Sequence, residues 1–222
     1  RLGGHEAPPA IISIFLGNEL QQIFENIQHN NLSMSTQKDL LNLGSSFPKI
    51  PQDISDRNRT SPFAFTGNKF EFRMPGSSAS PATPTFILNT IVAEILKEYA
   101  DMLEEWADLS PNLKVITLIQ QQYPKYKNIL FNGNGYDKNW EIEAKNLGLS
   151  NFKNTVEALP NYISEETISL FERNQVLTRA ELQSRFHVYC ERYNKQNNIE
   201  ISSAIEIARN EIYPSVLGYI TK

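Results

Sequence analysis

The chain has 222 residues, enough for one large domain or two small ones, and either arrangement can bury a substantial core. Its formal charge of −4 argues against nucleic acid as a default partner, and its single cysteine, Cys190, excludes an internal disulfide and fits a reducing compartment. No apolar run approaches the ~18 residues that a membrane span needs, so we expect no membrane association and a cytoplasmic location.

The first pattern after the opening residues is a run of apolar positions at helical spacing from Ile11 to Ile27. The β-branched residues at the start of this run leave a strand as the alternative there. Residues 29–56 contain Asn, Gly and Pro turn signals without periodicity, which predicts a long loop. We expect His29 at the surface and not at a metal.

A strand with two different faces is predicted next, because Lys69-Phe70-Glu71-Phe72-Arg73 alternates strictly between charged and aromatic residues. Phe70 and Phe72 are expected to face a core, and the opposite face is a row of cation, anion and cation at roughly 7 Å intervals. One interpretation is a solvated face with weak ion pairs. The other is a site for an anionic substrate and a metal ion, because cations bind carboxylate or phosphate and a carboxylate binds Mg²⁺.

Two helices are predicted after this strand. Thr83 or Thr85 can cap the first, which is expected to run to about Ala107. Its predicted core stripe consists of Ile87, Ile91, Ile95, Tyr99 and Met102. Ser110 and a first-turn proline open the second helix, and Tyr123-Pro124 is expected to break it.

The segment Phe131-Asn-Gly-Asn-Gly-Tyr136 carries two Asn-Gly turn signals. Its two glycines lack the third glycine and the strand-to-helix context of a nucleotide-binding fingerprint, which favours a tight structural turn over a phosphate site. A helix is expected from Trp140 to Leu147, with Gly148 as its stop.

Two more helices are predicted near the C-terminal end. The first starts with the capping box Thr178-Arg179-Ala180-Glu181 and presents one apolar face, formed by Leu182, Phe186, Tyr189 and Tyr193. His187 and Cys190 on this helix lack the further ligands that a metal site requires. The final helix starts near Ile201, with Pro214 as a break or kink. No catalytic constellation is visible after residue 101.

Three motifs resemble the C-terminal catalytic motifs of the glutamine synthetase family, in the same order. They are Arg1-Leu2 with Glu6-Ala7-Pro8, then Asn58-Arg59-Thr60-Ser61, then Lys69-x-Glu71-x-Arg73. The inserted residues 10–56 and the segment 131–136 resemble the large type III branch of that family. Since the sequence begins inside the first of these motifs, we expect it to be part of a longer polypeptide.

The resemblance implies a reaction and roles for the cationic residues. Glutamine synthetases use ATP to join glutamate and ammonia through a γ-glutamyl phosphate intermediate. By motif, Arg1 and Arg73 would bind substrate carboxylates, where a planar guanidinium pairs bidentately. Arg59 would contact the nucleotide and stabilise the phosphoryl group during its transfer. Lys69 stands where the common form has a nucleotide-contacting arginine, and a further arginine is absent near Ala64 or Phe65.

The same resemblance implies roles for two carboxylates. Glu6 would lie on a flap that closes over glutamate, and would help to bind ammonium and take its proton. Glu71 would be a ligand of a Mg²⁺ or Mn²⁺ ion that bridges the nucleotide phosphates. The other metal ligands of the family precede Arg1, and a neighbouring subunit in a ring-shaped homo-oligomer completes the site. We therefore expect the 222 residues alone to be inactive.

The expected fold class is α+β: part of an antiparallel glutamine synthetase catalytic barrel, followed by a mostly helical C-terminal region. Residues 1–100 are expected to be the end of the catalytic domain, with the insertion at about 10–56, and residues 101–222 the helical region. Two alternatives remain open. One is a related ligase that joins glutamate to another amine, and the other is a non-catalytic helical assembly module.

Overall fold

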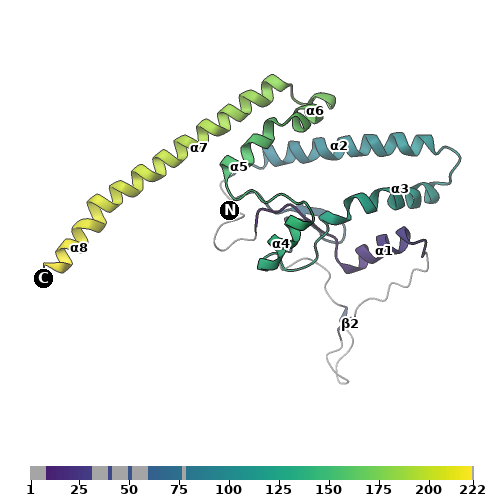
Figure 1. The fold of residues 1–222 in the computed structure, drawn as a ribbon, viewed down its shortest axis with the longest axis horizontal. Coiled ribbons are helices and arrows are strands. Elements are labelled where there is room, and N and C mark those ends of the chain that lie inside the picture. Colours follow the sequence, from purple (N-terminus) through teal and green to yellow (C-terminus); the bar gives the residue numbers. More distant parts are fainter. Residues whose placement is uncertain (1–8, 32–39, 42–49, 52–59, 77–78, 222) are drawn as a thin grey trace. The chain divides into compact units, whose positions relative to one another are not determined.

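The computed structural model describes residues 9–31, 40–41, 50–51, 60–76 and 79–221. Helices make up most of these residues, and the short strands all lie in the first third of the chain (Figure 1). The expected α+β class is therefore confirmed. The chain divides into two compact units, Arg1–Lys153 and Asn154–Lys222.

A small sheet organises the first unit. Within the described residues its strands lie in the order β1 (Ile14–Phe15), β4 (Phe63–Phe65) and β5 (Phe70–Phe72). β1 runs parallel to β4, and β4 pairs with β5 in antiparallel fashion. In the turn between β4 and β5, Thr66 N donates to Lys69 O at 2.8 Å. This hairpin fixes which side chains of β5 lie opposite β4.

The helix predicted from residue 10 starts later than expected. β1 occupies residues 14–15, where the sequence left a strand as the alternative, and α1 covers Asn18–Gln28. Gly17 separates the two elements with φ +78°, a backbone conformation that residues other than glycine rarely adopt. Two short strands, β2 (Leu40–Leu41) and β3 (Ile50–Pro51), pair in antiparallel fashion within the predicted loop. The rest of residues 32–59 lies outside the described residues.

α2 (Ala82–Glu105) is close to its predicted length, but its cap differs from the expectation. The N-cap position is Pro81, and Ser80 Oγ, not Thr83 or Thr85, accepts the hydrogen bond from the first-turn amide of Ala82 at 3.2 Å. Thr85 donates to the Pro81 carbonyl instead. Four members of the predicted stripe are half-buried, whereas Ile91 is 42 % exposed.

α3 (Pro111–Tyr126) contacts both α1 and α2 (Figure 1). Lys114 Nζ donates to the Leu103 carbonyl of α2 at 2.7 Å. The predicted break at Tyr123-Pro124 is wrong by a few residues, because Pro124 lies inside the last turn and a 3₁₀ turn (Lys127–Ile129) follows the helix. A proline in the last turn of a helix removes one backbone hydrogen bond but leaves the preceding turns of the helix intact.

α4 (Lys138–Asn146) contributes Trp140 and Ala144 to the buried core of the first unit. Asp137 caps it by accepting a hydrogen bond from Asn139 N at 2.9 Å, and Gly148, at φ +79°, follows its end as predicted. The buried cluster consists of Ile11, Trp140 and Ala144, with Phe131, Leu147 and Leu149 packed against it. The core thus joins residues near the start of the chain to the segment around residues 131–149.

The second unit consists of helices: α5 (Thr155–Ala158), a 3₁₀ turn (Leu159–Ile163), α6 (Glu165–Arg173), α7 (Arg179–Ile207) and α8 (Tyr213–Ile220). The predicted capping box is confirmed, because the side chain and backbone of Thr178 exchange hydrogen bonds with Glu181 at the start of α7. The predicted apolar face is also confirmed, with Leu182 fully buried and the three aromatic residues half-buried.

The predicted separate helix near Ile201 is wrong. Residues 201–207 continue α7, and a π-helical turn (Ala208–Ile212) joins it to α8, so that Figure 1 shows one long helical rod. In this turn Tyr213 N donates to Ala208 O, five residues back, just ahead of Pro214. Every residue from Glu200 to Thr221 is exposed. No helix among the described residues combines the length and apolar character needed to cross a membrane.

Candidate functional site

The three charged side chains predicted to share one face of β5 do so in the structure. Arg73 Nε and Nη2 both donate to Glu71 Oε2, at 3.2 and 3.0 Å. Lys69 Nζ lies 3.4 Å from Glu71 Oε1. One carboxylate is thus held between two cations, which leaves this face with one net positive charge. Such a face suits an anionic ligand.

The two cations keep the central carboxylate ionised. The hydrogen bonds from the Arg73 guanidinium, followed by those from Lys69, hold the pKa of the Glu71 carboxyl below its usual range. The side chains remain accessible, with 39 % of the Glu71 side chain and 30 % of the Arg73 side chain exposed. An approaching ligand can therefore compete for these groups, and the ion pairs contribute little stability on their own.

The register of β4 shows what lies beside the charged face. Ala64 is directly opposite Glu71, and it is completely buried. It stands near the position where the family resemblance leads us to expect another arginine. The β4 position across from Glu71 therefore contributes no cation.

The aromatic face of the same hairpin differs from the expectation. Phe63 stacks on Phe70 with ring centroids 5.2 Å apart, and Phe65 lies 5.3 Å from Phe70. Phe70 is nevertheless 47 % exposed, so the prediction that both rings of β5 are in a core is wrong for Phe70, while Phe72 is half-buried. Among the described strands, β5 lies at the edge of the sheet. Fewer neighbouring side chains therefore cover Phe70 than would cover a residue on a central strand.

The remaining predicted site residues, Arg1, Glu6 and Arg59, lie outside the described residues. Their proximity to the charged face stays a prediction. Thr60, which follows Arg59, is buried and lines an open depression of about 460 Å³ together with Asn132, Gly133 and Asn134.

A buried hydrogen-bonded junction, which the sequence did not reveal, lies at the start of β4. Ser13 Oγ donates to Ser61 Oγ at 2.9 Å, and Ser61 Oγ donates to the Phe131 carbonyl at 2.9 Å. Phe131 N donates to Ile14 O at 2.9 Å, so residues 130–131 run along β1. Isolated serines carry no sequence pattern that would have identified this junction.

The segment 131–136 is a structural turn, as predicted. Asn132 Oδ1 accepts hydrogen bonds from Leu16 N and Gly17 N at 3.3 and 3.2 Å, and Asn132 Nδ2 donates to Gln21 Oε1 at 2.6 Å. The amide thus ties the turn between β1 and α1 to the Asn-Gly segment. Its amide nitrogen and oxygen are both used in these contacts, which favours the structural role over phosphate binding.

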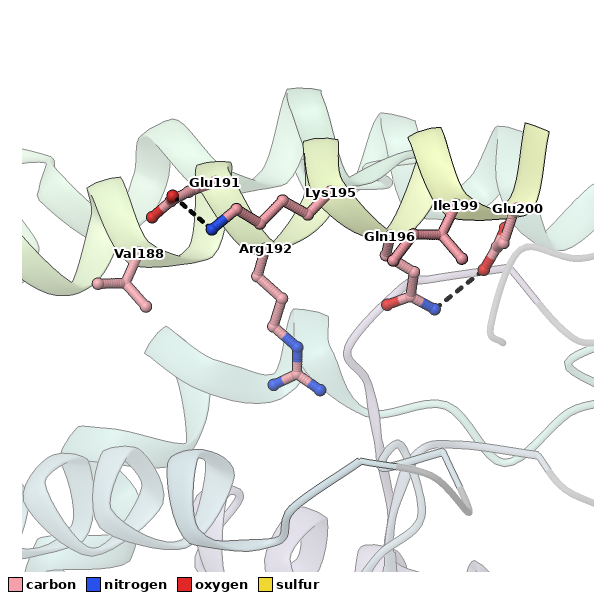
Figure 2. A pocket seen from close by; sticks show the side chains of 7 residues that line it. All are labelled: Val188, Glu191, Arg192, Lys195, Gln196, Ile199 and Glu200. Carbon is pink, nitrogen blue, oxygen red and sulfur yellow. Dashed lines mark hydrogen bonds and ion pairs between the residues drawn. The ribbon is translucent and has the colours of Figure 1, made fainter. Parts of the chain in front are cut away.

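A second group of polar side chains lies on α7, and Figure 2 shows it from close by. The residues lining this pocket are Val188, Glu191, Arg192, Lys195, Gln196, Ile199 and Glu200. Lys195 pairs with Glu191 at 2.7 Å and Gln196 donates to Glu200 at 2.9 Å (Figure 2). These are i, i+4 contacts along one exposed helix face, and such pairs support the helix locally. These contacts indicate no catalytic or ligand-binding role for this face of α7.

A model of the glutamine synthetase C-terminal domain matches residues 114–222. The chain is 42 % identical over 221 residues to a type-3 glutamine synthetase of Dictyostelium discoideum, covering 99 % of this chain and 30 % of that protein. It is 36 % identical to glutamine synthetases of Butyrivibrio fibrisolvens and Bacteroides fragilis (strain YCH46), over 99 % of this chain and 31 % of each relative. The chain thus spans about 30 % of the length of these relatives. The family resemblance is confirmed, because residues 114–222 match the C-terminal domain of glutamine synthetase and the chain is similar to glutamine synthetases over 99 % of its length.

Proposed function

We propose that the chain is the C-terminal part of an ATP-dependent glutamate–ammonia ligase, which forms glutamine through a γ-glutamyl phosphate intermediate. The observation that carries this proposal is the charged face of β5, where Lys69 and Arg73 flank the ionised Glu71. The reaction belongs to the longer polypeptide, and we expect the 222 residues alone to form no glutamine.

The chemistry explains why a face of this kind is useful. A carboxylate oxygen of glutamate is a poor leaving group, and phosphorylation makes it a good one. Moving a phosphoryl group from one anion to another requires positive charge at fixed positions. The Arg73 guanidinium presents a planar fork that matches a substrate carboxylate, whereas the Lys69 ammonium supplies a point charge towards the nucleotide.

Residues outside the described part complete this assignment. By their motifs, Arg1 would bind a glutamate carboxylate and Arg59 the transferring phosphoryl group. Glu6 would bind ammonium on a closing flap and remove its proton, which leaves neutral ammonia as the nucleophile. The closed flap would also keep water from the acyl phosphate.

Glu71 fits the role of one metal ligand, but the described residues do not form a complete metal site. Among these residues, no group of three His, Cys, Asp or Glu side chains is close enough to hold an ion. A bound Mg²⁺ or Mn²⁺ would neutralise phosphate charge, and its other ligands would come from elsewhere in the longer polypeptide. We further propose that β4 and β5 belong to an antiparallel barrel, and that a ring of subunits completes the site.

The test is glutamine formation by the full-length protein with Mg²⁺, ATP, glutamate and ammonia. We expect Glu71→Gln to lower activity by about 100-fold or more, the scale of losing one electrostatic group of an active site. Glu166→Gln, at an exposed position of α6, is the matched control and should retain activity. Thermal stability measured with and without Mg²⁺ reports on metal binding independently, and Glu71→Gln should weaken the Mg²⁺-induced shift.

Each other outcome points to a different conclusion. A wild-type protein that uses another amine, but not ammonia, would indicate a related glutamate–amine ligase. A wild-type protein inactive with every amine would favour the helical assembly module. A fully active Glu71→Gln variant would leave the family standing and refute the role given to Glu71.

A further inference from the structure

We infer that Ser61 is a positioning residue, through which the C-terminal region of the chain holds the strand that carries Arg73. The inference rests on the proposed function, because it concerns the binding of glutamate by Arg73. It assigns a role in substrate binding to a region without a catalytic motif, the part that matches the C-terminal domain model from residue 114 onward.

The C-terminal region is attached to the sheet through residues 130–131. Leu130 forms a parallel bridge with Ile14, and Phe131 N donates to Ile14 O at 2.9 Å. Residues 130–131 thus extend the sheet beyond β1, on the opposite side from β4 and β5. This places the backbone of the C-terminal region in direct contact with the strands that lead to the charged face.

The contact point, Phe131, is held in place by packing and hydrogen bonds. The Phe131 ring stacks on the buried Trp140, with ring centroids 3.6 Å apart. The next residue, Asn132, is held by three hydrogen bonds that involve Leu16, Gly17 and Gln21. The Phe131 carbonyl therefore has a fixed position from which to accept a hydrogen bond.

Two hydrogen bonds connect the Phe131 carbonyl to Arg73. Ser61 Oγ, on a residue only 3 % exposed, donates to the Phe131 carbonyl at 2.9 Å. The carbonyl of the next residue, Pro62, accepts from Arg73 N at 2.7 Å. The Arg73 guanidinium then contacts Glu71. A shift of residues 61–62 would thus be transmitted to Arg73 through a single backbone hydrogen bond.

The test compares two serines of the same buried pair in the full-length protein. Ser61→Ala removes the bond to the Phe131 carbonyl, whereas Ser13→Ala removes the other hydroxyl and leaves that bond intact. We expect Ser61→Ala to raise the KM for glutamate by about tenfold or more, because misplacement by ~1 Å can cost up to 10²-fold. The KM for ATP should stay unchanged. Ser13→Ala should lower the thermal midpoint and keep the KM for glutamate within about twofold.

Every other result is decisive. An unchanged KM for glutamate in Ser61→Ala, or an equal rise in Ser13→Ala, would overturn the inference and leave the proposed function intact. If Ser61→Ala does not fold, Ser61→Cys retains a weaker donor, and its KM for glutamate should still rise; a wild-type KM there would also overturn the inference. A wild-type protein that forms no glutamine would remove the proposed function and this inference together.

Discussion

Gly133 offers the sharpest test of how the 131–136 turn is packed. A Cβ atom added at this position would lie 2.8 Å from Phe131 Cζ and 3.0 Å from Cε2, closer than such contacts normally come. The Phe131 ring has little room to retreat, because it stacks on Trp140 with ring centroids 3.6 Å apart. Overpacking of a well-filled site costs about 1–3 kcal/mol, so Gly133→Ala should lower the free energy of unfolding by that amount.

The assay is thermal and urea unfolding of the 222-residue chain, followed by circular dichroism and tryptophan fluorescence. For a unit of this size, 1 kcal/mol shifts the midpoint by about 2–4 °C, so a fall of roughly 2–12 °C is expected. Trp140 fluorescence should change as well, because the ring stacked on it moves. Phe131→Leu combined with Gly133→Ala should recover part of the loss, because the two substitutions act on one contact.

The matched control is Gly76→Ala, the same chemical change in the same unit. An added Cβ at Gly76 meets nothing within 4 Å, so the free energy of unfolding should change by less than ~0.5 kcal/mol. A Gly133→Ala variant as stable as the wild type, with unchanged fluorescence, would refute the tight packing around Phe131. The rigid contact point used in the inference about Ser61 would then lose its support.

Two further predictions concern the second unit. Leu182→Ala should lower the free energy of unfolding in urea by about 2–5 kcal/mol, because the side chain is fully buried. Ile220→Ala, at a side chain 71 % exposed, should change it by less than ~0.5 kcal/mol. Similar losses at both positions would show that α8 is packed. Arg179 holds the pKa of Glu165 below its ordinary value of 4.5, so this pair contributes stability above that pH and loses it as the pH falls through the lower, folded-state value. In stability measurements on a falling pH series, Glu165→Gln should flatten the acid dependence, and an unchanged slope would contradict the pairing.

Local patterns in the sequence predicted those features that depend on neighbouring residues alone. The alternation of residues 69–73 placed Lys69, Glu71 and Arg73 on one face, since successive side chains of a strand point to opposite sides. The Thr178 capping box and the glycine stop of α4 were predicted for the same reason, because caps depend on backbone groups within a few positions. The order of motifs also indicated the similarity to glutamine synthetases, which extends over 99 % of the chain.

Features that depend on contacts between distant segments could not be read in this way. Periodicity near residue 14 did not separate a strand from a helix, because a strand of two residues is defined by its partners β4 and Leu130. The separate helix predicted near Ile201 is an error of another kind, because nothing in the local sequence interrupts the backbone hydrogen bonds of α7 there.

The charged face shows the same division between sequence and tertiary structure. The sequence alone determined which side chains it contains and that they share one side of β5. Only the tertiary structure placed the buried Ala64 across from Glu71 and joined Ser61 to the carbonyl of Phe131, 70 positions away. Strand register and a hydrogen bond of that range arise when the whole unit packs, so no local pattern encodes them.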